Sequence, residues 1–160
     1  FLINFNRETI RRRRDELHER NVKIEFIGRE NWRIPKGLLN DMEEARQLTK
    51  KNTGLVFTVA FNYGGRAELV DAVKEIIKSG VDETKITEKK ISTYLYNNQM
   101  PDADLIIRTS GEERLSNFLL WQSAYSELLF LEDLWPDFTR TTFQEAIKEY
   151  QRRTRRFGEL

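Results

Sequence analysis

The sequence predicts an α/β fold in which a mostly parallel central sheet is flanked by helices. Short apolar segments typical of strands alternate with longer segments whose apolar residues recur at helical spacing. Residues 55–61 read LVFTVAF, and such a nearly all-apolar run is typical of a parallel strand covered on both faces. No repeat or interdomain linker interrupts this alternation, so residues 1–160 are expected to form one domain.

The first half of the chain is predicted to form a helix, then a strand, then a second helix. Residues 22–27 alternate apolar with charged side chains before Gly28, which is typical of a strand. Pro35 is placed to begin the second helix, and Gly54 follows its end. The apolar face of the first helix is expected to comprise Phe1, Leu2, Phe5, Ile10 and Leu17. The face of the second is expected to comprise Leu38, Leu39, Met42, Ala45 and Leu48.

A third helix is predicted after the strand at residues 55–61. Gly64 and Gly65 allow the turn that leads into it, and Gly80 ends it. Its inner face is expected to comprise Leu69, Val70, Val73, Ile76 and Ile77.

The remaining segments predict a short helix at residues 88–96, strands at 104–109 and 128–131, and a final helix. Strands that alternate with helices imply right-handed crossovers, and ligands of such sheets bind beyond the carboxyl ends of the strands. The final helix is expected to begin at one of two capping boxes, Thr141 with Gln144 or Thr142 with Glu145.

Composition excludes several classes of protein. The formal net charge is only +1, so no global field favours nucleic acid, and any anion site must be local. The basic stretch Arg11–Arg14 is interpreted as a solvated helix face, because Asp15 and Glu16 follow it at once. His18, on the same charged helix, is expected at the surface. Without cysteine, the chain has no disulfide and no thiolate nucleophile.

The most informative run is residues 104–127, DLIIRTSGEERLSNFLLWQSAYSE, where a strand delivers polar residues into one loop. Arg108 lies at the strand exit, and Arg114 and Ser116 follow it. A guanidinium carries a planar fork of donors that matches phosphate oxygens, and hydroxyls can complete such a site. This pattern predicts a diphosphate site. An equally open interpretation is a structural ion network with Glu112, Glu113 or Glu127.

The run resembles the signature of the cis-prenyltransferase family, which includes undecaprenyl diphosphate synthase. Three further stretches agree with that family: Asn62-Tyr63-Gly64-Gly65-Arg66, Leu134-Trp135-Pro136-Asp137-Phe138 and Arg155-Arg156-Phe157-Gly158. The resemblance implies an undecaprenyl diphosphate synthase-like fold. It also implies an enzyme that condenses isopentenyl diphosphate with an allylic diphosphate into a polyprenyl diphosphate.

The resemblance assigns roles residue by residue. Arg108, Arg114 and Ser116 would hold the diphosphate of isopentenyl diphosphate, and Glu127 would bind Mg²⁺. Glu112 would orient an arginine rather than contact substrate. Further substrate-binding residues would come from the family's terminal R-x-G element, here Arg156 and Gly158.

One departure from the family is as informative as the match. The Asp-Gly-Asn-x-Arg-Trp segment that supplies the family's principal magnesium-binding aspartate does not occur in this sequence, so no catalytic residue is assigned. Glu30-Asn31-Trp32 only looks like a second family segment. We therefore interpret the chain as the later two thirds of a subunit, without its N-terminal strands and inactive alone.

The resemblance also implies a homodimer, and the lipid product would bring peripheral membrane contact. A cytoplasmic location is expected from the lack of cysteine and of a long apolar span, and no nucleic-acid partner is expected because the net charge is only +1. The growing hydrocarbon would need an apolar tunnel, for which Leu2, Phe5 and Leu55 are candidate walls. Two alternatives remain at this point: a non-catalytic accessory subunit of the same fold, and a nucleotide-binding α/β module. The second would need a glycine-rich loop after its first strand, and none is visible.

Overall fold

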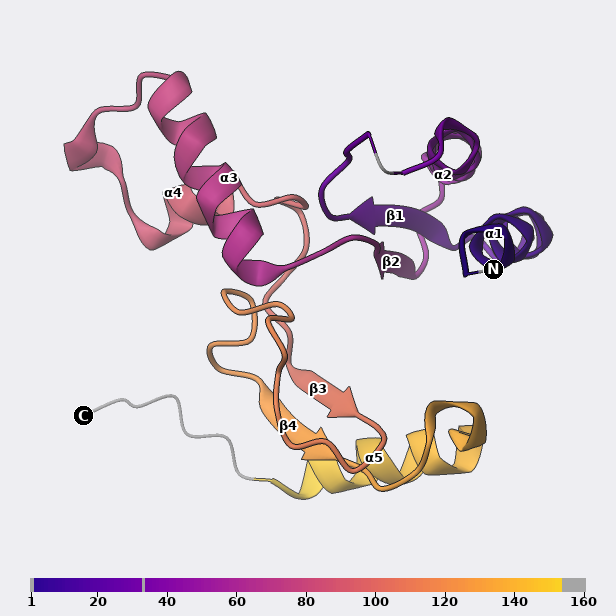
Figure 1. Cartoon of the computed structure of the whole chain (residues 1–160). Coiled ribbons are helices and arrows are strands. Elements are labelled where there is room, and N and C mark those ends of the chain that lie inside the picture. Colours follow the sequence, from indigo (N-terminus) through magenta and orange to yellow (C-terminus); the bar gives the residue numbers. More distant parts are fainter. Residues whose placement is uncertain (1, 33, 154–160) are drawn as a thin grey trace. The chain divides into compact units, whose positions relative to one another are not determined.

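A computed structural model describes residues 2–32 and 34–153, with side chains from Arg7 onward. The chain divides into two compact units. Unit 1 comprises the chain up to Tyr63 together with Leu95–Asn97, and unit 2 comprises the rest. The helices and strands of each unit are labelled in Figure 1.

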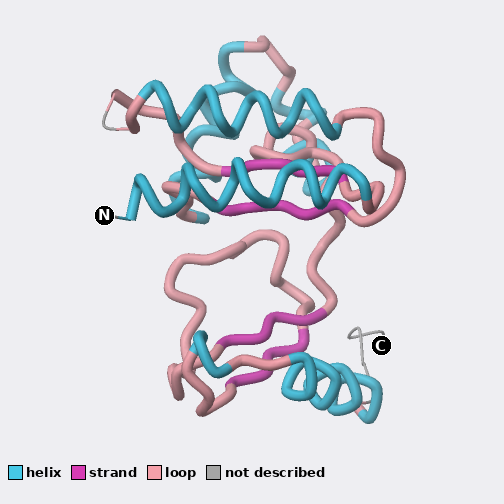
Figure 2. The backbone as a smooth tube through the Cα atoms, turned by 90° about the vertical axis from the view of Figure 1, so that its right-hand side faces the viewer, coloured by secondary structure: helices cyan, strands magenta, loops and turns pink. Residues whose placement is uncertain are grey.

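Unit 1 contains a parallel pair of strands covered by two helices. Its helices are α1 (Leu2–Glu19) and α2 (Lys36–Thr49), and its strands are β1 (Lys23–Ile27) and β2 (Val56–Ala60). The pairing runs in register from Lys23 opposite Val56 to Ile27 opposite Ala60. Figure 2 shows these two strands side by side, with a helix running along them.

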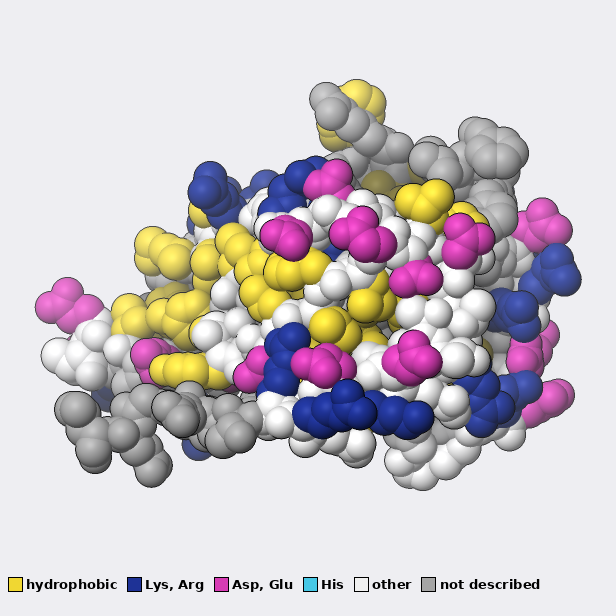
Figure 3. Space-filling view, turned by 90° about the horizontal axis from the view of Figure 1, so that it is seen from below, with side chains coloured by type: hydrophobic (Ala, Val, Ile, Leu, Met, Phe, Trp, Pro, Cys, Tyr) yellow, Lys and Arg dark blue, Asp and Glu magenta, His cyan; other side chains and the backbone are white. Residues whose placement is uncertain are grey.

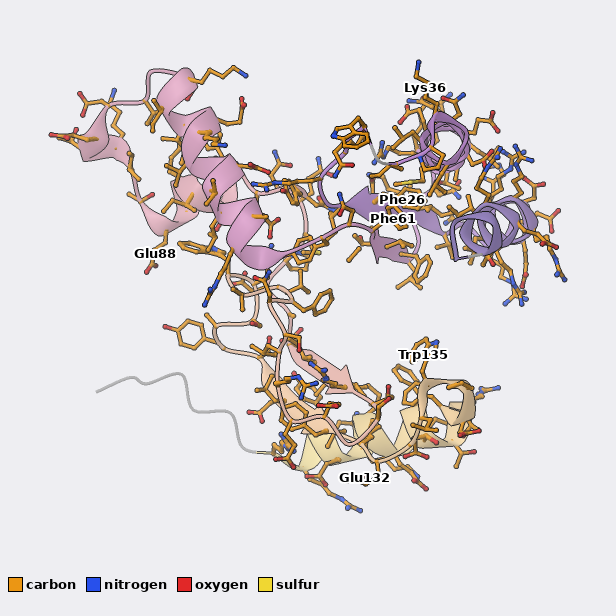
Figure 4. The ribbon with its side chains drawn as sticks, in the orientation of Figure 1. Phe26, Lys36, Phe61, Glu88, Glu132 and Trp135 are labelled. Atoms are coloured by element: carbon orange, nitrogen blue, oxygen red, sulfur yellow. The ribbon has the colours of Figure 1, made fainter. Side chains whose placement is uncertain are left out.

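The core of unit 1 lies between α2 and β1. Alternate positions of β1 are buried, as its alternating sequence predicts. Phe61, just after β2, packs on this core, and Figure 4 labels it beside Phe26. The buried members of the core are Ile24, Phe26, Ile34, Leu38, Met42 and Ala45.

A buried carboxylate joins α1 to α2. Asp41 is only 1% exposed, and it accepts hydrogen bonds from Arg7 (2.6 Å) and Arg11 (2.8 Å). Burial alone would raise the pKa of Asp41, but the bonds from the two guanidiniums outweigh it and hold the pKa below its usual range. Arg14 pairs with the exposed Glu44. The prediction of a fully solvated basic stretch is therefore only partly right, because Arg11 binds the buried Asp41.

Unit 2 contains the second parallel pair, β3 (Leu105–Arg108) and β4 (Glu127–Phe130). Its helices are α3 (Gly65–Lys78), α4 (Glu88–Ser92) and α5 (Arg140–Arg152). Two short 3₁₀ turns complete it, at Glu83–Lys85 and Trp135–Asp137. In Figure 4, the labelled Trp135 lies at the second of these turns, just before α5.

The α/β class with parallel strands is confirmed, but the described strands form two separate pairs rather than one continuous sheet. The predicted burial of residues 55–61 on both faces is wrong, because Leu55, Val56 and Phe57 are about half exposed or more. The physical reason is that β2 pairs with β1 alone among the described strands. Figure 3 shows a face on which apolar and charged side chains both reach the surface.

Two helix predictions are corrected. On α3 only Ile76 of the expected inner stripe is buried, whereas Val70, Val73 and Ile77 lie exposed. The buried α3 side chains are Glu68, Ala72 and Ile76. The buried face of the helix is therefore rotated away from the predicted stripe and includes the charged residue Glu68.

The final helix begins earlier than either predicted capping box. Thr139 is its N-cap, and its hydroxyl accepts a hydrogen bond from the Thr142 amide at 3.2 Å. The helix is therefore capped by Thr139 alone, and not by either of the two predicted capping boxes. Among the described residues, no helix is both long and apolar enough to cross a membrane.

Replacement of Asp41 with asparagine should lower the free energy of unfolding by about 1–2 kcal/mol at neutral pH, because a buried acceptor of two charge-assisted bonds is weakened. Urea unfolding measures this. The pKa of Asp41 is lowered in the folded state, so its stabilisation is present above the ordinary carboxyl pKa of about 3.9. It is lost as the pH falls through the lowered value, and the two proteins should then converge.

The matched control is Glu44→Gln, which removes the exposed partner of Arg14 in the same pair of helices. It should change stability by less than about 0.5 kcal/mol. An equal effect of the two changes, or a loss at Asp41 that is independent of pH, would contradict the assignment.

Candidate anion-binding site

The loop between β3 and β4 has an unusual backbone. Ser110, Ser116, Asn117 and Leu119 all have positive φ, from 44° to 75°, a region that side chains other than glycine rarely adopt. Such conformations persist only where the surroundings hold them, and they cluster at functional sites. This loop is therefore held in place by its contacts rather than by regular secondary structure.

Arg108 connects the end of β3 to the far side of the loop. Its Nη1 donates to the Ser116 hydroxyl at 2.8 Å and to the Arg114 carbonyl. Within the described part of the chain, the contacts of Arg108 involve Nη1 only, so its Nε and Nη2 donors remain for a ligand. The structure thus brings Arg108 and Ser116 together, as the sequence predicted.

Arg114 lies on the surface and forms an ion pair with Glu112. Glu112 thus contacts one of the two arginines that it was expected to orient. The pair is exposed, so it contributes little stability, and a dianionic ligand could compete for this guanidinium. The interpretation as an ion network therefore holds for Arg114, and Arg108 is the better placed of the two arginines for an anion.

Two main-chain bonds fix the start of the loop. The Ser110 amide donates to the Asp133 carbonyl (2.7 Å), and the Gly111 amide donates to the Leu131 carbonyl (2.9 Å). Gly111 has a φ of 63°, and a Cβ there would lie 2.7 Å from a carboxylate oxygen of Glu132. Glu132 is labelled in Figure 4. The segment after β4 therefore supports the Arg108 end of the site.

The later part of the loop is bonded to the start of α3. The Asn117 carbonyl accepts from the Gly65 amide, and its side-chain oxygen accepts from the Arg66 amide, both at 2.8 Å. A Cβ on Gly65 would lie 2.8 Å from Leu120 Cγ. The expectation that this glycine allows a close turn is confirmed.

A buried polar pair lies one turn further along α3. Gln122 is 3% exposed and donates to Glu68, itself 1% exposed, at 3.2 Å. The sequence reasoning missed Asn117, Glu68 and Gln122. Glu68 lies outside the apolar stripe that the periodicity of α3 predicted, so the sequence pattern carried no signal for this pair.

Glu127, the predicted magnesium ligand, opens β4 and is bound by Arg153. The Arg153 Nη1 donates to the Glu127 carboxylate and to the Leu128 carbonyl, both at 2.9 Å. The bond to Glu127 raises the pKa of Arg153 above its already high usual value. Among the described residues, no group of three or more His, Cys, Asp or Glu side chains lies close enough to hold a metal ion. Arg156 and Gly158 lie outside the described residues.

Unit 1 contains an apolar cavity of about 490 Å³ against its strand pair. Leu55, predicted as a tunnel wall, lines it together with Phe57 and Val59, which are on β2. On the α1 side the lining includes Ile10 and Leu17. The side chains of Leu2 and Phe5, the other predicted walls, lie outside the described part of the structure.

Two other residues named in the sequence analysis are Asn62, in a stretch that resembles the family, and His18, which was expected at the surface. Asn62 follows β2 with a φ of 50°, and its side chain donates to the Arg29 carbonyl at 2.6 Å, so it braces a neighbouring loop of unit 1. His18 is exposed on α1, as predicted.

Comparison with known proteins identifies the family. A family model described as "Putative undecaprenyl diphosphate synthase" matches residues 1–158, and the chain belongs to this family. It is 49% identical over 162 residues to a trans,polycis-polyprenyl diphosphate synthase, (2Z,6E)-farnesyl diphosphate specific, of Thermobifida fusca. That match covers 99% of this chain and 57% of the relative.

Other relatives agree. An isoprenyl transferase of Streptococcus pneumoniae is 52% identical, over 89% of this chain and 60% of the relative. The chain thus spans about three fifths of the length of these curated relatives. Lavandulyl diphosphate synthase from Lavandula x intermedia, solved with dimethylallyl diphosphate, matches with a TM-score of 0.93 at 32% identity, over 99% of this chain and 70% of that one.

A structure of a probable undecaprenyl diphosphate synthase from Campylobacter jejuni matches with a TM-score of 0.84 at 30% identity. That match covers 95% of this chain and 70% of the Campylobacter jejuni chain.

Replacement of Gly65 with alanine should destabilise the protein by about 1–3 kcal/mol, although alanine is the better helix former, because the added methyl meets Leu120. Thermal unfolding measures the change. Glu75→Ala, on the exposed side of the same helix, is the control and should stay within about 0.5 kcal/mol of the parent. A Gly65→Ala protein as stable as the parent would show that α3 and the loop are not packed this closely.

Proposed function

We propose that this protein elongates a cis-prenyl chain by condensing isopentenyl diphosphate with an allylic diphosphate. The observation that carries the proposal is Arg108, which lies at the carboxyl end of β3 with Ser116 on one side of its guanidinium. Its Nε and Nη2 are the donors expected to meet diphosphate oxygens. Family membership supports the same chemistry.

In the proposed reaction, the C–O bond of the allylic diphosphate breaks and diphosphate leaves. The terminal alkene carbon of isopentenyl diphosphate forms the new C–C bond, and loss of a proton restores a double bond in the cis form. Arg108, Arg114 and Ser116 hold the homoallylic diphosphate and thereby fix the position of the attacking carbon. This placement removes much of the entropic barrier, since both reactants are held in one geometry.

Mg²⁺ is the proposed cofactor, because this hard cation prefers carboxylate and phosphate oxygens and neutralises diphosphate. Glu127 is the carboxylate proposed to contact it, together with an aspartate that this sequence does not contain. Such binding requires that Arg153 release or share the Glu127 carboxylate. A homodimer, substrate contacts from Arg156 and Gly158, and a cytoplasmic site of action complete the proposal.

The hydrocarbon product is proposed to extend into the apolar cavity of unit 1. The cavity volume of about 490 Å³ is in the usual range for small-molecule sites, and its lining is mostly apolar. Side chains of α1 and β2 line it, so their sizes would set how far a growing chain can extend.

In the natural protein that contains this chain, Arg108→Ala should lower turnover by roughly a hundredfold and raise KM for isopentenyl diphosphate, because one preorganised donor group is lost. Incorporation of labelled isopentenyl diphosphate into extractable lipid measures both quantities. Arg140→Ala, an exposed arginine at the start of α5, is the matched control and should behave as the parent.

Two outcomes would refute the proposal. One is normal turnover and normal KM in the Arg108→Ala protein. The other is an absence of any incorporation by the parent protein with farnesyl diphosphate as primer. An assay with a chelator in place of Mg²⁺ tests the cofactor separately, and full activity there would remove Mg²⁺ from the proposal.

Leu55→Trp should shorten the average product, because a larger side chain on the cavity wall leaves less room for the hydrocarbon. Chromatography of the extracted lipids gives the chain lengths. Leu48→Trp places the same side chain on an α2 residue outside the cavity lining, and should leave the product unchanged. The same product distribution from both proteins would place the growing chain elsewhere.

A further inference from the structure

Helix α3 takes its N-terminal cap from a residue 51 positions away in the sequence. The residue at its own N-cap position is Gly64, which has no side chain to accept a hydrogen bond. Helices normally satisfy their first amides with a side chain at that position. Here Asn117 does so instead, and it accepts from Gly65 with its carbonyl and from Arg66 with its side chain, both at 2.8 Å.

The backbone of Asn117 is suited to this task. Its φ is 66°, in the left-handed region where asparagine is the best tolerated residue after glycine. Ser116, immediately before it, is also left-handed with a φ of 48°. Two successive left-handed residues set the direction in which the Ser116 hydroxyl points, and that hydroxyl accepts from Arg108 at 2.8 Å.

We propose that Asn117 is a positioning residue that holds Ser116 and Arg108 in place for the homoallylic diphosphate by capping α3. The inference rests on the proposed function of the site. The proposed role of Asn117 requires no contact with substrate. It transmits the rigidity of a helix of 14 residues to a loop that has no secondary structure of its own.

The contact is close on both sides. A Cβ on Gly64 would lie 2.8 Å from Asn117 Nδ2, so the helix start and the asparagine are fitted to each other. The buried bond between Gln122 and Glu68 attaches the end of the loop to the same helix independently. Loss of the Asn117 side chain should therefore loosen the site locally and leave the fold in place.

Asn117→Gly tests this in the complete natural protein, because glycine tolerates the positive φ and keeps the main-chain carbonyl that Gly65 uses, while it removes the side chain that caps Arg66. KM for isopentenyl diphosphate should rise by roughly three- to tenfold, as expected for a lost cap. KM for the allylic primer should stay the same, and the Gly65 and Arg66 amides should exchange faster with deuterium. Asn117→Asp keeps an acceptor, and its KM should lie between those of Asn117→Gly and the parent.

Asn98→Gly, an exposed asparagine elsewhere in unit 2, is the matched control and should leave both KM values unchanged. Faster amide exchange in Asn117→Gly with an unchanged KM would make Asn117 a helix cap only and would overturn the inference.

Arg108→Ala, measured in parallel, separates the two claims. A raised KM in Arg108→Ala with a normal KM in Asn117→Gly refutes the positioning role and leaves the proposed function standing. A normal KM in Arg108→Ala refutes the diphosphate site itself.

Discussion

The hydrogen bonds between Asn117 and the first amides of α3 are the constraint on which the candidate site depends. The loop from β3 to β4 contains several left-handed residues and no regular element that could hold it. Without an external support its backbone would sample other conformations, since each such residue costs free energy. The helix supplies that support, because its unsatisfied amides require acceptors and Asn117 offers two.

Charge around the site is balanced locally rather than by the chain as a whole. Arg114 pairs with Glu112, and Glu127 pairs with Arg153. Arg108 differs because the partners of its Nη1 are a hydroxyl and a carbonyl, neither of which neutralises it. The proposed diphosphate would neutralise Arg108, whereas a cation at Glu127 would compete with an existing ion pair. The Arg108 end of the candidate site would thus suit an anion, whereas the Glu127 end would accept a cation only if its ion pair with Arg153 opened.

In unit 1, a buried ion pair joins the two helices, and an apolar cavity lies against the strands. Asp41 ties α1 to α2, so the helix pair keeps its spacing although a cavity remains against the strands. Alternate residues of the apolar segment 55–61 line the cavity, and Val59 and Phe61 also pack against the core. An apolar strand that is left partly exposed is costly unless something covers it, and a hydrocarbon ligand is one such cover.

The sequence by itself determined the order of helices and strands, their parallel direction and the loop that carries Arg108 and Ser116. Those features follow from local periodicity, from turn residues and from a long ordered motif, all readable within a few positions. Tertiary structure decided which faces are buried, as Val73 and Phe57 show, because burial depends on neighbours that periodicity does not specify. It also decided the roles of Asn117, Glu68 and Arg153, whose partners lie 26 to 54 positions away along the chain. Only folding brings such residues within hydrogen-bonding distance.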